Sequence, residues 1–332
     1  MRFASPFAAV ALAACTTSPA TTVPSPSSGR AAAPAPAVAA PLATPAALGC
    51  RDVGIYSDLD PHVRLDLPRR FDRAALTAVV DDTHATLVLY ERDWPLKLYP
   101  LGAAGGTRLT LTSGDVVLVR AADAAELTPL LAGRPARHLG AHERLPPGDR
   151  DDDGIPDPLD VLVGGKKLIA NGASYTQDYF LLPYPGGDAP RDKGSCADVV
   201  VRALRNAGLD LQVGIAEDVA HDPAAYPMVK KPDASIDHRR VRTMLPYFRR
   251  HLEVHGSDPA DANDPFRPGD IVFMDTLPGK PGPDHVGIVS DVVGESGLPL
   301  VINNWTDGYR DAEMDLLGFV PVLARFRLVA NR

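Results

Sequence analysis

The 332-residue sequence has little of several features that mark particular protein classes. It contains three cysteines and two tryptophans, and 6% of its residues are aromatic. No apolar run reaches the roughly 18 residues of a membrane span. Basic residues are also scarce, with 34 Lys and Arg against 42 Asp and Glu and a formal net charge of -8. This balance argues against a nucleic-acid partner, because phosphate binding needs a basic face.

The sequence does contain enough hydrophobic residues for a packed core, since they make up 45% of the chain. The length is sufficient for one large or two ordinary domains. The composition therefore predicts a globular protein, and its function must be read from local motifs.

The first 15 residues, MRFASPFAAVALAAC, are typical of an export signal and not of a folded domain. One positive residue, Arg2, precedes a short apolar stretch that ends in Leu-Ala-Ala-Cys at 12–15. This stretch resembles a bacterial lipoprotein signal with its lipobox, which implies that Cys15 is acylated and becomes the mature first residue. An ordinary secretory signal is the alternative. Because Thr16 follows the cysteine in place of Asp, the lipoprotein sorting rule implies the outer membrane, in a cell that has one.

Residues 16–49 are rich in Ala, Pro, Ser and Thr and carry one charge, Arg30. Such a segment buries too little apolar surface to fold and predicts a tether. At roughly 3.1 Å per residue, it could reach on the order of 100 Å. We therefore expect a cell-envelope protein that is anchored in the membrane by its lipid, faces the periplasm and works at the cell wall.

Residues 50–135 predict a small β-rich domain. The segments TLVLYERDWPLKLYPLG at 86–102 and RLTLTSGDVVLV at 108–119 contain β-branched and aromatic runs broken by turn residues. The first segment faintly resembles the opening strands of L,D-transpeptidase domains. That family's cysteine motif is missing, because no cysteine lies between Cys50 and Cys196. We therefore expect an accessory domain without that chemistry.

An acidic segment, DRDDDGIPDPLD at 149–160, lies in a linker that we place at residues 136–160. Its oxygen-bearing residues occupy places 1, 3, 5, 7, 9 and 12 of a twelve-residue loop, where oxygen atoms can surround one hard cation. Gly154 stands at place 6, where the loop must turn sharply. The candidate calcium ligands are Asp149, Asp151, Asp153, the carbonyl group of Ile155, Asp157 and Asp160.

The acidic loop resembles the Asp-rich loops of EF-hand, dockerin and thrombospondin type-3 repeats. Place 12 holds Asp160 in place of the bidentate Glu, and Pro146, Pro147 and Gly148 exclude a helix directly before the loop. We therefore expect a lone calcium loop that acts as a structural staple between the domains. A solvated acidic turn is the alternative.

One cysteine stands where a helix is predicted to begin, in GSCADVVVRALRNAG at 194–208. The apolar residues of this segment fall at helical spacing, Ser195 and Asp198 can form a capping box, and the closing glycine can end the helix. Cys196 then occupies the first helical position, where the helix dipole favours the thiolate over the thiol. A buried structural thiol and a disulfide with Cys50 are the alternatives to a nucleophile.

A cysteine hydrolase also needs an imidazole near the thiolate and a polar group that orients it. Among nine histidines, His285 opens an apolar strand, HVGIVSD, after a Pro/Gly turn. On the following strand, PLVINNW, Asn303 and Asn304 point to alternate sides, and Asn303 is the better placed to face His285. A cysteine helix followed by such strands predicts an α+β fold for residues 161–332.

Several motifs in the same order give roughly residues 160–328, half of the chain, a family resemblance. Tyr-x-Gly-Gly-x-x-Pro before Cys196, then Gly-Asp-Ile-Val and His-Val-Gly-Ile-Val after it, resemble papain-like NlpC-type cell-wall hydrolases. Within that group, the segment 184–211 together with IDHRRV, RPGDIV, HVGIVSD and PLVINN is similar to a bacterial family catalogued as domain of unknown function 1287. The resemblance implies a cysteine helix packed on an antiparallel sheet, a Cys–His–polar site and amide hydrolysis in peptidoglycan stem peptides.

Carried onto this sequence, the resemblance makes Cys196 the nucleophile, His285 the general base and acid, and Asn303 the orienting group. Tyr184 matches a tyrosine near the thiolate, whose hydroxyl can bond the oxyanion or the substrate. The backbone N–H of Cys196, at the helix start, is the natural oxyanion donor. The residues that either bind substrate or lock the fold are Asp188, Asp237, His238, Arg239 and Arg240.

The sequence therefore predicts a lipid-anchored cysteine peptidase or amidase that acts on peptidoglycan or another peptide amide, without a catalytic cofactor. The alternatives are a catalytically silent wall-binding or scaffold lipoprotein and a papain-like acyltransferase acting on lipids. A zinc site on Cys196 and His285 is the weakest option, since no CxxC or HxxxH spacing supplies further ligands. Rapid alkylation of Cys196 near neutral pH is expected of a working site.

Overall fold

The computed structural model describes residues 63–102, 104–277, 279–280 and 282–329. The chain divides into two units, Met1–Pro45 and Ala46–Arg332, and all described residues belong to the second. The predicted signal, the tether, the lipidated Cys15 and Cys50 lie outside the described residues. Within those ranges, no helix combines the length and the apolar character that crossing a membrane requires.

The first part of the described chain forms a four-stranded sheet of order β3-β2-β1-β6. Strands β1, β2 and β3 are an antiparallel meander, whereas β6 runs parallel to β1. A parallel neighbour needs a crossover connection, and helix α1 lies within it. The elements are β1 Leu76–Asp81, β2 Thr86–Glu91, β3 Trp94–Pro100, β4 Thr107–Thr110, β5 Val116–Val119, α1 Ala121–Leu131 and β6 Ala136–His138, preceded by a 3-10 turn, η1 Arg73–Ala75.

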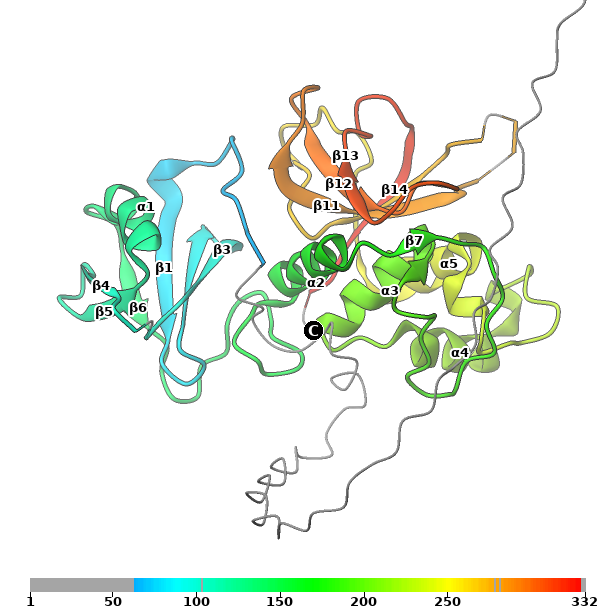
Figure 1. The fold of residues 1–332 in the computed structure, drawn as a ribbon, viewed down its shortest axis with the longest axis horizontal. Helices are drawn as coiled ribbons and strands as arrows, with labels where there is room; N and C mark the ends of the chain where they lie inside the picture. The colour runs from blue at the N-terminus through cyan, green and yellow to red at the C-terminus, as the bar shows by residue number, and fades with distance from the viewer. Residues whose placement is uncertain (1–62, 103, 278, 281, 330–332) are drawn as a thin grey trace, which may run out of the picture. The chain divides into compact units, whose positions relative to one another are not determined.

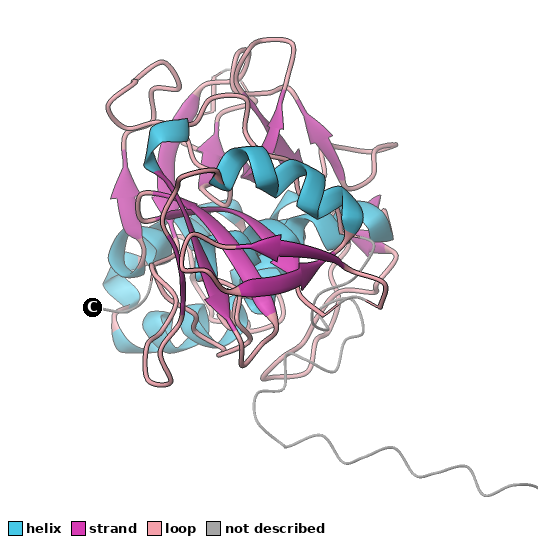
Figure 2. Cartoon of the chain, turned by 90° about the vertical axis from the view of Figure 1, so that its left-hand side faces the viewer, coloured by secondary structure: helices cyan, strands magenta, loops and turns pink. Residues whose placement is uncertain are grey.

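Side chains of this sheet alternate between two cores. In β1, Leu76, Ala78 and Val80 pack with α1 and the β4–β5 hairpin, whereas Val79 joins the core that contains α2. Helix α1 lies across one face of the sheet (Figure 2). The strands predicted within 86–102 and 108–119 are present, but the β-rich prediction missed α1, and β6 lies in the segment assigned to the linker.

The second part, from α2 onward, combines helices with a six-stranded antiparallel sheet of order β13-β12-β11-β10-β14-β9. Figure 1 shows α2, α3 and α5 along one face of that sheet. The helices are α2 Asp157–Asn171, α3 Cys196–Asn206, α4 Leu211–His221 and α5 Val241–His251, with short 3-10 turns η2 Pro223–Ala225 and η3 Asp237–Arg239. The strands are β7 Ser174–Tyr175, β8 Lys193–Gly194, β9 Glu253–His255, β10 Ile271–Met274, β11 His285–Val293, β12 Pro299–Asn303, β13 Ala312–Met314 and β14 Val322–Arg327.

The predicted α+β class is confirmed, with the cysteine helix packed on an antiparallel sheet. Val286 and Ile288 face α2 and α3, whereas Val289 and Val301 belong to a separate cluster on the other face of the sheet. Helices α2 and α3 approach closely at Gly164, where a Cβ atom would lie 2.9 Å from the Cα atom of Ala203. A side chain at this position would force the two helices apart.

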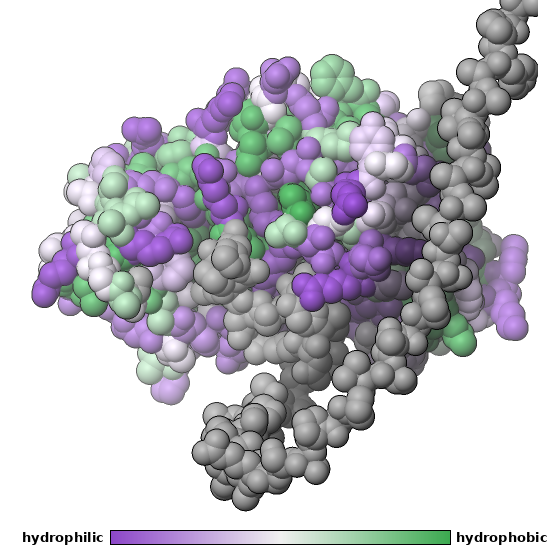
Figure 3. All heavy atoms as spheres, viewed as in Figure 1, coloured by the Kyte–Doolittle hydropathy of each residue, from purple (hydrophilic) through white to green (hydrophobic). Residues whose placement is uncertain are grey.

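The surface seen in Figure 3 mixes hydrophilic and hydrophobic residues. Large exposed apolar side chains of the described chain include Leu181 and Phe319, which are far apart in the sequence. Scattered exposed apolar residues of this kind are ordinary. This view therefore gives no single apolar patch, among the described residues, that would mark a docking face.

The start of α3 is fixed by a buried ion pair. The predicted capping box is present, with the Ser195 amide donating to Asp198 at 2.7 Å. Arg239 donates from Nε and Nη2 to the two carboxylate oxygens of Asp198, at 2.6 and 3.0 Å. Burial alone would raise the pKa of Asp198, but the hydrogen bonds and charge of Arg239 lower it below its usual value. Asp198 is therefore ionised, and it holds the turn that carries Cys196.

Replacing Arg239 by methionine is expected to lower the free energy of unfolding by about 3–5 kcal/mol, because it leaves a buried carboxylate without its partner. The matched control is Arg240→Met, since the side chain of Arg240 is 53% exposed in its pair with Asp237. Urea unfolding of both variants tests this. Equal losses in the two variants would contradict the account of α3.

Candidate active site

Cys196 opens α3 as a buried free thiol, with 8% of its surface exposed. Burial raises the pKa of the thiol to about 12; the backbone amides of Val286 and Ala197 lower it, and the charges of Asp198 and Asp284 raise it. The predicted preference for the thiolate is therefore wrong for this conformation. Loss of hydration outweighs the favourable field at the helix start.

His285 lies at the beginning of β11 and is also buried. Its Nε2 atom lies 3.1 Å from Oδ1 of Asn303, while Nδ2 of Asn303 donates to the carbonyl of Val301 at 3.1 Å. Because the Asn303 amide nitrogen is committed to that carbonyl, its oxygen must accept from His285. The proton of the neutral imidazole is therefore on Nε2, and Nδ1 is left as the basic nitrogen.

The imidazole of His285 is held in an apolar setting. The ring contacts Trp305 with centroids 4.8 Å apart and planes at 61°. Burial lowers the pKa of His285 to about 4, although the hydrogen bond to Asn303 and the charge of Asp284 act in the opposite direction. His285 is therefore neutral at pH 7, as is the thiol of Cys196.

Cys196 and His285 both lie near the start of β11. The amide of Val286, the residue after His285, contacts the thiol of Cys196. Val286 packs with α3, and since side chains alternate along a strand, the side chain of His285 leaves β11 on the other face. No hydrogen bond joins the thiol and the imidazole in the part of the chain that the structure describes. Proton transfer between the two groups therefore requires a rearrangement that turns the imidazole toward the thiol.

A tyrosine that the sequence did not single out, Tyr175, lies in the fold close to the segment of Cys196. Tyr184 is half exposed and precedes a cis peptide bond to Pro185. Tyr175 instead pairs with Gly194 in the β7–β8 ladder, two residues before Cys196. Burial raises the pKa of Tyr175, and the charge of Cys196 raises it further. Sequence reasoning missed Tyr175 because a two-residue strand pair across a long loop leaves no periodic signal.

The residues predicted to bind substrate or lock the fold are used in internal contacts. Asp188 accepts from Nε of Arg202 at 2.9 Å, and Asp237 accepts from the amide of Asp233 at 2.7 Å. His238 is buried, its Nδ1 atom has no hydrogen bond, and burial together with the charge of Arg205 lowers its pKa to about 4. With Arg239 bound to Asp198, these contacts support the fold-stabilising role.

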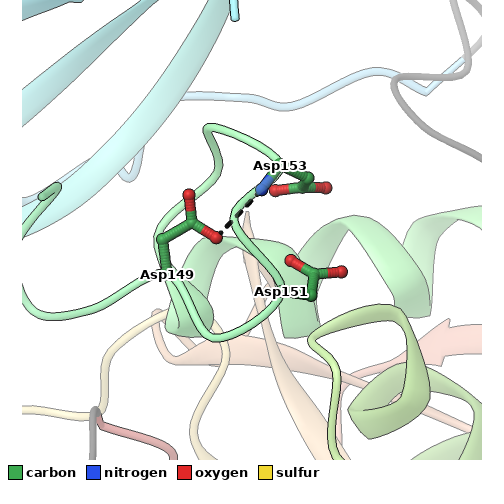
Figure 4. A group of neighbouring side chains, drawn as sticks. All are labelled: Asp149, Asp151 and Asp153. Carbon is green, nitrogen blue, oxygen red and sulfur yellow. Dashed lines mark hydrogen bonds between the residues drawn. The ribbon is translucent and has the colours of Figure 1, made fainter. Parts of the chain in front are cut away.

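The predicted calcium ligands come together in part. Asp149, Asp151 and Asp153 each place one carboxylate oxygen within 4.8 Å of the others (Figure 4). Asp157 and Asp160 lie in the first turn of α2, and both are buried. Asp160 contacts Asn206 at the end of α3, whereas Cys196 stands at the start of that helix, so a cation here would stabilise the fold without entering the reaction.

Comparison with known families agrees with the motifs around Cys196. Residues 163–328, half of the chain, match the family described as Domain of unknown function (DUF1287). The chain belongs to this family. The DUF1287 segment contains Tyr175, Cys196, His285 and Asn303, whereas the four-stranded sheet and the acidic loop precede it.

A curated relative of this DUF1287 protein is the uncharacterized protein YijF of Escherichia coli (strain K12). The two are 38% identical over 163 residues, which cover 47% of this chain and 75% of the relative. The shared region is about as long as the DUF1287 segment.

The alkylation rate of Cys196 is expected to rise continuously with pH, by about tenfold per pH unit from pH 6 to 10, because the thiolate fraction grows tenfold per unit below the pKa. Iodoacetamide labelling at several pH values, with mass-spectrometric quantification of the peptide that contains Cys196, measures this rate. A plateau reached below about pH 8 would show that the resting protein holds a thiolate.

Stability is expected to fall as the pH drops from about 6.5 to 4. His238 and His285 have folded pKa values below their unfolded values, so the unfolded state binds protons first in this window. Each histidine should contribute up to about 3 kcal/mol, present above pH 6.5 and lost on acidification. His238→Gln should reduce this slope, whereas His221→Gln at an exposed site should not; urea unfolding at three pH values measures both. Identical slopes in parent and His238→Gln would refute the assignment.

Proposed function

We propose that this DUF1287 protein is a papain-like cysteine hydrolase of the cell envelope that cleaves amide bonds in peptidoglycan stem peptides. The observation that carries the proposal is the hydrogen bond of His285 to Asn303, which leaves Nδ1 of the imidazole as a base on β11, the strand that packs against the cysteine helix α3. A nucleophile, a base and an orienting group are the parts that nucleophilic acyl transfer needs.

The neutral state of both groups specifies how the reaction would start. Nδ1 of His285 accepts the thiol proton as the sulfur of Cys196 attacks the carbonyl carbon of the substrate, so no thiolate accumulates beforehand. Asn303 holds the imidazolium that forms. The imidazolium then protonates the departing amine, which leaves a thioester on Cys196.

Water completes the cycle. His285 takes a proton from the water as its oxygen attacks the thioester, and returns that proton to the departing sulfur. The products are a carboxylic acid and the restored thiol. During both steps, the carbonyl oxygen becomes negative, and the backbone N–H of Cys196 at the start of α3 is a donor for it. The hydroxyl of Tyr175 is a further candidate donor, because Tyr175 pairs with Gly194 and interacts with the charge of Cys196.

The antiparallel strands support the papain-like assignment. His285 and Asn303 come from β11 and β12, which are neighbours in the sheet, and the cysteine helix packs against β11. The family resemblance implies this arrangement. In it, a helix begins at the nucleophile, and two adjacent strands carry the base and its partner. This likeness concerns the site, and fold alone does not establish a substrate.

The placement in the envelope is part of the same proposal. It is supported by the lipobox that ends in Cys15 and by the long Ala/Pro-rich segment after it. With its lipid in the outer membrane, the chain would reach peptidoglycan from the periplasmic side. A peptide amide of the wall is then the substrate within reach.

A second candidate function is a wall-binding protein without catalysis. The observation that favours it is the buried, protonated thiol that makes no hydrogen bond to His285 among the described residues. Such a protein would bind peptidoglycan and leave it intact.

The full chain incubated with purified peptidoglycan is expected to release soluble muropeptides and new amino groups. Cys196→Ala should abolish release, because the nucleophile is lost, and His285→Ala should reduce the rate by about 10²–10⁴-fold. Tyr175→Phe should slow release more than the control Tyr184→Phe, which alters a half-exposed hydroxyl. Mass spectrometry of the products identifies the broken bond.

Three outcomes would contradict this function. Full activity of Cys196→Ala would remove the proposed chemistry. Binding to peptidoglycan without any product would favour the silent wall-binding protein, and transfer of an acyl group to an acceptor other than water would favour an acyltransferase.

A further inference from the structure

The acidic loop before α2 is folded so that its carboxylates converge. Asp149 accepts hydrogen bonds from the amides of Asp153 and Gly154 at 3.1 and 2.8 Å. Gly154 has a φ of 88°, and a Cβ atom there would lie 2.3 Å from Cβ of His84, so glycine is required. Figure 4 shows the carboxylates of Asp149, Asp151 and Asp153 around the same turn. The turn thus gathers three negative groups with no histidine or cysteine among them.

A second and independent feature lies beneath that turn. Asp157 and Asp160, in the first turn of α2, are each 1% exposed. In each carboxylate Oδ1 accepts a hydrogen bond, from the Arg150 amide at 2.7 Å and from Nδ2 of Asn206, respectively. The other oxygen of each, Oδ2, is buried without any hydrogen bond. A buried carboxylate oxygen without a partner is costly, so these two atoms need a cation or a proton.

Hydrogen bonds and close packing join these two carboxylates to the acidic loop. The amide of Asp157 donates to the carbonyl of Gly148 at 2.7 Å, and its carboxylate accepts from the amide of Arg150, which stands between Asp149 and Asp151. Asp160 binds Asn206 at the end of α3, and a Cβ atom at Gly208, directly after α3, would lie 2.9 Å from Cβ of Asp151. The loop, the start of α2 and the end of α3 therefore meet around these side chains.

The positive groups nearby do not satisfy these oxygens. Nε of Arg150 lies 4.0 Å from Oδ2 of Asp157, beyond hydrogen-bond distance. Nζ of Lys167 donates to Oδ1 of Asn206 at 2.9 Å. Oδ2 of Asp157 and Oδ2 of Asp160 therefore keep no hydrogen bond in the part of the chain that the structure describes.

We propose that Asp149, Asp151, Asp153, Asp157 and Asp160 bind one Ca²⁺ ion. Oxygen-only donors favour a hard cation, and Ca²⁺ accepts 6–8 oxygen ligands in a flexible arrangement, whereas Mg²⁺ demands a stricter octahedron and retains water. The carbonyl of Ile155, at place 7 of the loop, is the further donor that such loops use. The proposal does not depend on the hydrolase activity.

The bound ion would join three parts of the fold. Asp157 and Asp160 belong to the first turn of α2, and Asp160 also binds Asn206 at the end of α3. On the other side, Thr86 at the start of β2 donates to the carbonyl of Gly154 at 3.4 Å. Calcium would therefore tie the loop, α2 and α3 together, and its removal should lower stability without altering the chemistry at Cys196.

The test uses the full chain, freed of metal with a chelator and then titrated with CaCl₂ or MgCl₂ alone. Calorimetry should show one Ca²⁺ per chain with a Kd of about 10⁻³ M or tighter, weaker binding of Mg²⁺, and a melting temperature that rises with Ca²⁺. Asp157→Asn and Asp160→Asn should each weaken Ca²⁺ binding by about tenfold or more.

The same variants separate loss of binding from loss of folding. In chelator, Asp160→Asn should melt no lower than the parent, because the amide removes a buried unpaired charge and its oxygen can still accept from Asn206. The matched control is Asp152→Asn in the same loop, since the Asp152 side chain is 71% exposed and its φ of 60° suits asparagine. This control should bind Ca²⁺ as the parent does.

Three results would overturn the proposal. The first is a parent protein whose melting temperature and heat of titration do not respond to Ca²⁺. The second is unchanged Ca²⁺ affinity in both Asp157→Asn and Asp160→Asn. The third is tighter binding of Mg²⁺ than of Ca²⁺, which would reject calcium as the ion.

Discussion

The buried pair of Asp198 and Arg239 is the interaction on which the site depends. Asp198 stands at the third helical position of α3, where its carboxylate also accepts from the amide of Ser195, so one charge fixes both the helix start and the residue before the nucleophile. Cys196 is placed by this turn, and its thiol also contacts the backbone amides of Val286 and Ala197. Close packing of α3 against α2 at Gly164 then holds the helix over β11.

Burial decides the protonation states of Cys196 and His285. Away from water, the neutral thiol and the neutral imidazole are the favoured forms, and the single hydrogen bond of His285 to Asn303 selects the tautomer with a free Nδ1. An uncharged amide partner suits a neutral imidazole, because it orients the ring without stabilising a resting imidazolium. Charged groups then form only in the complex with substrate. There the backbone N–H groups at the start of α3 can stabilise the negative charge.

Local patterns in the sequence were sufficient to predict the ends of α3 and the partner of His285. The capping box at Ser195, the glycine after α3, and the alternation that points Asn303 toward His285 are all set by neighbours a few residues away. The raised pKa of Cys196 depends on how much of the fold covers it, and the place of Tyr175 depends on a two-residue strand pair. Such tertiary effects leave no periodic trace, and helix α1 was likewise hidden within a β-rich segment.

The protonation state of His285 in the resting protein is the most direct test of this account. Nitrogen NMR of the full chain labelled with ¹⁵N-histidine reports each ring nitrogen, and Asn303→Ala identifies the His285 signals. The account predicts a neutral ring with its proton on Nε2 from about pH 5 to 8, and loss of that tautomer preference in Asn303→Ala. A protonated imidazolium at pH 7 that becomes neutral in Cys196→Ala would contradict it, because it would show a resting thiolate–imidazolium pair.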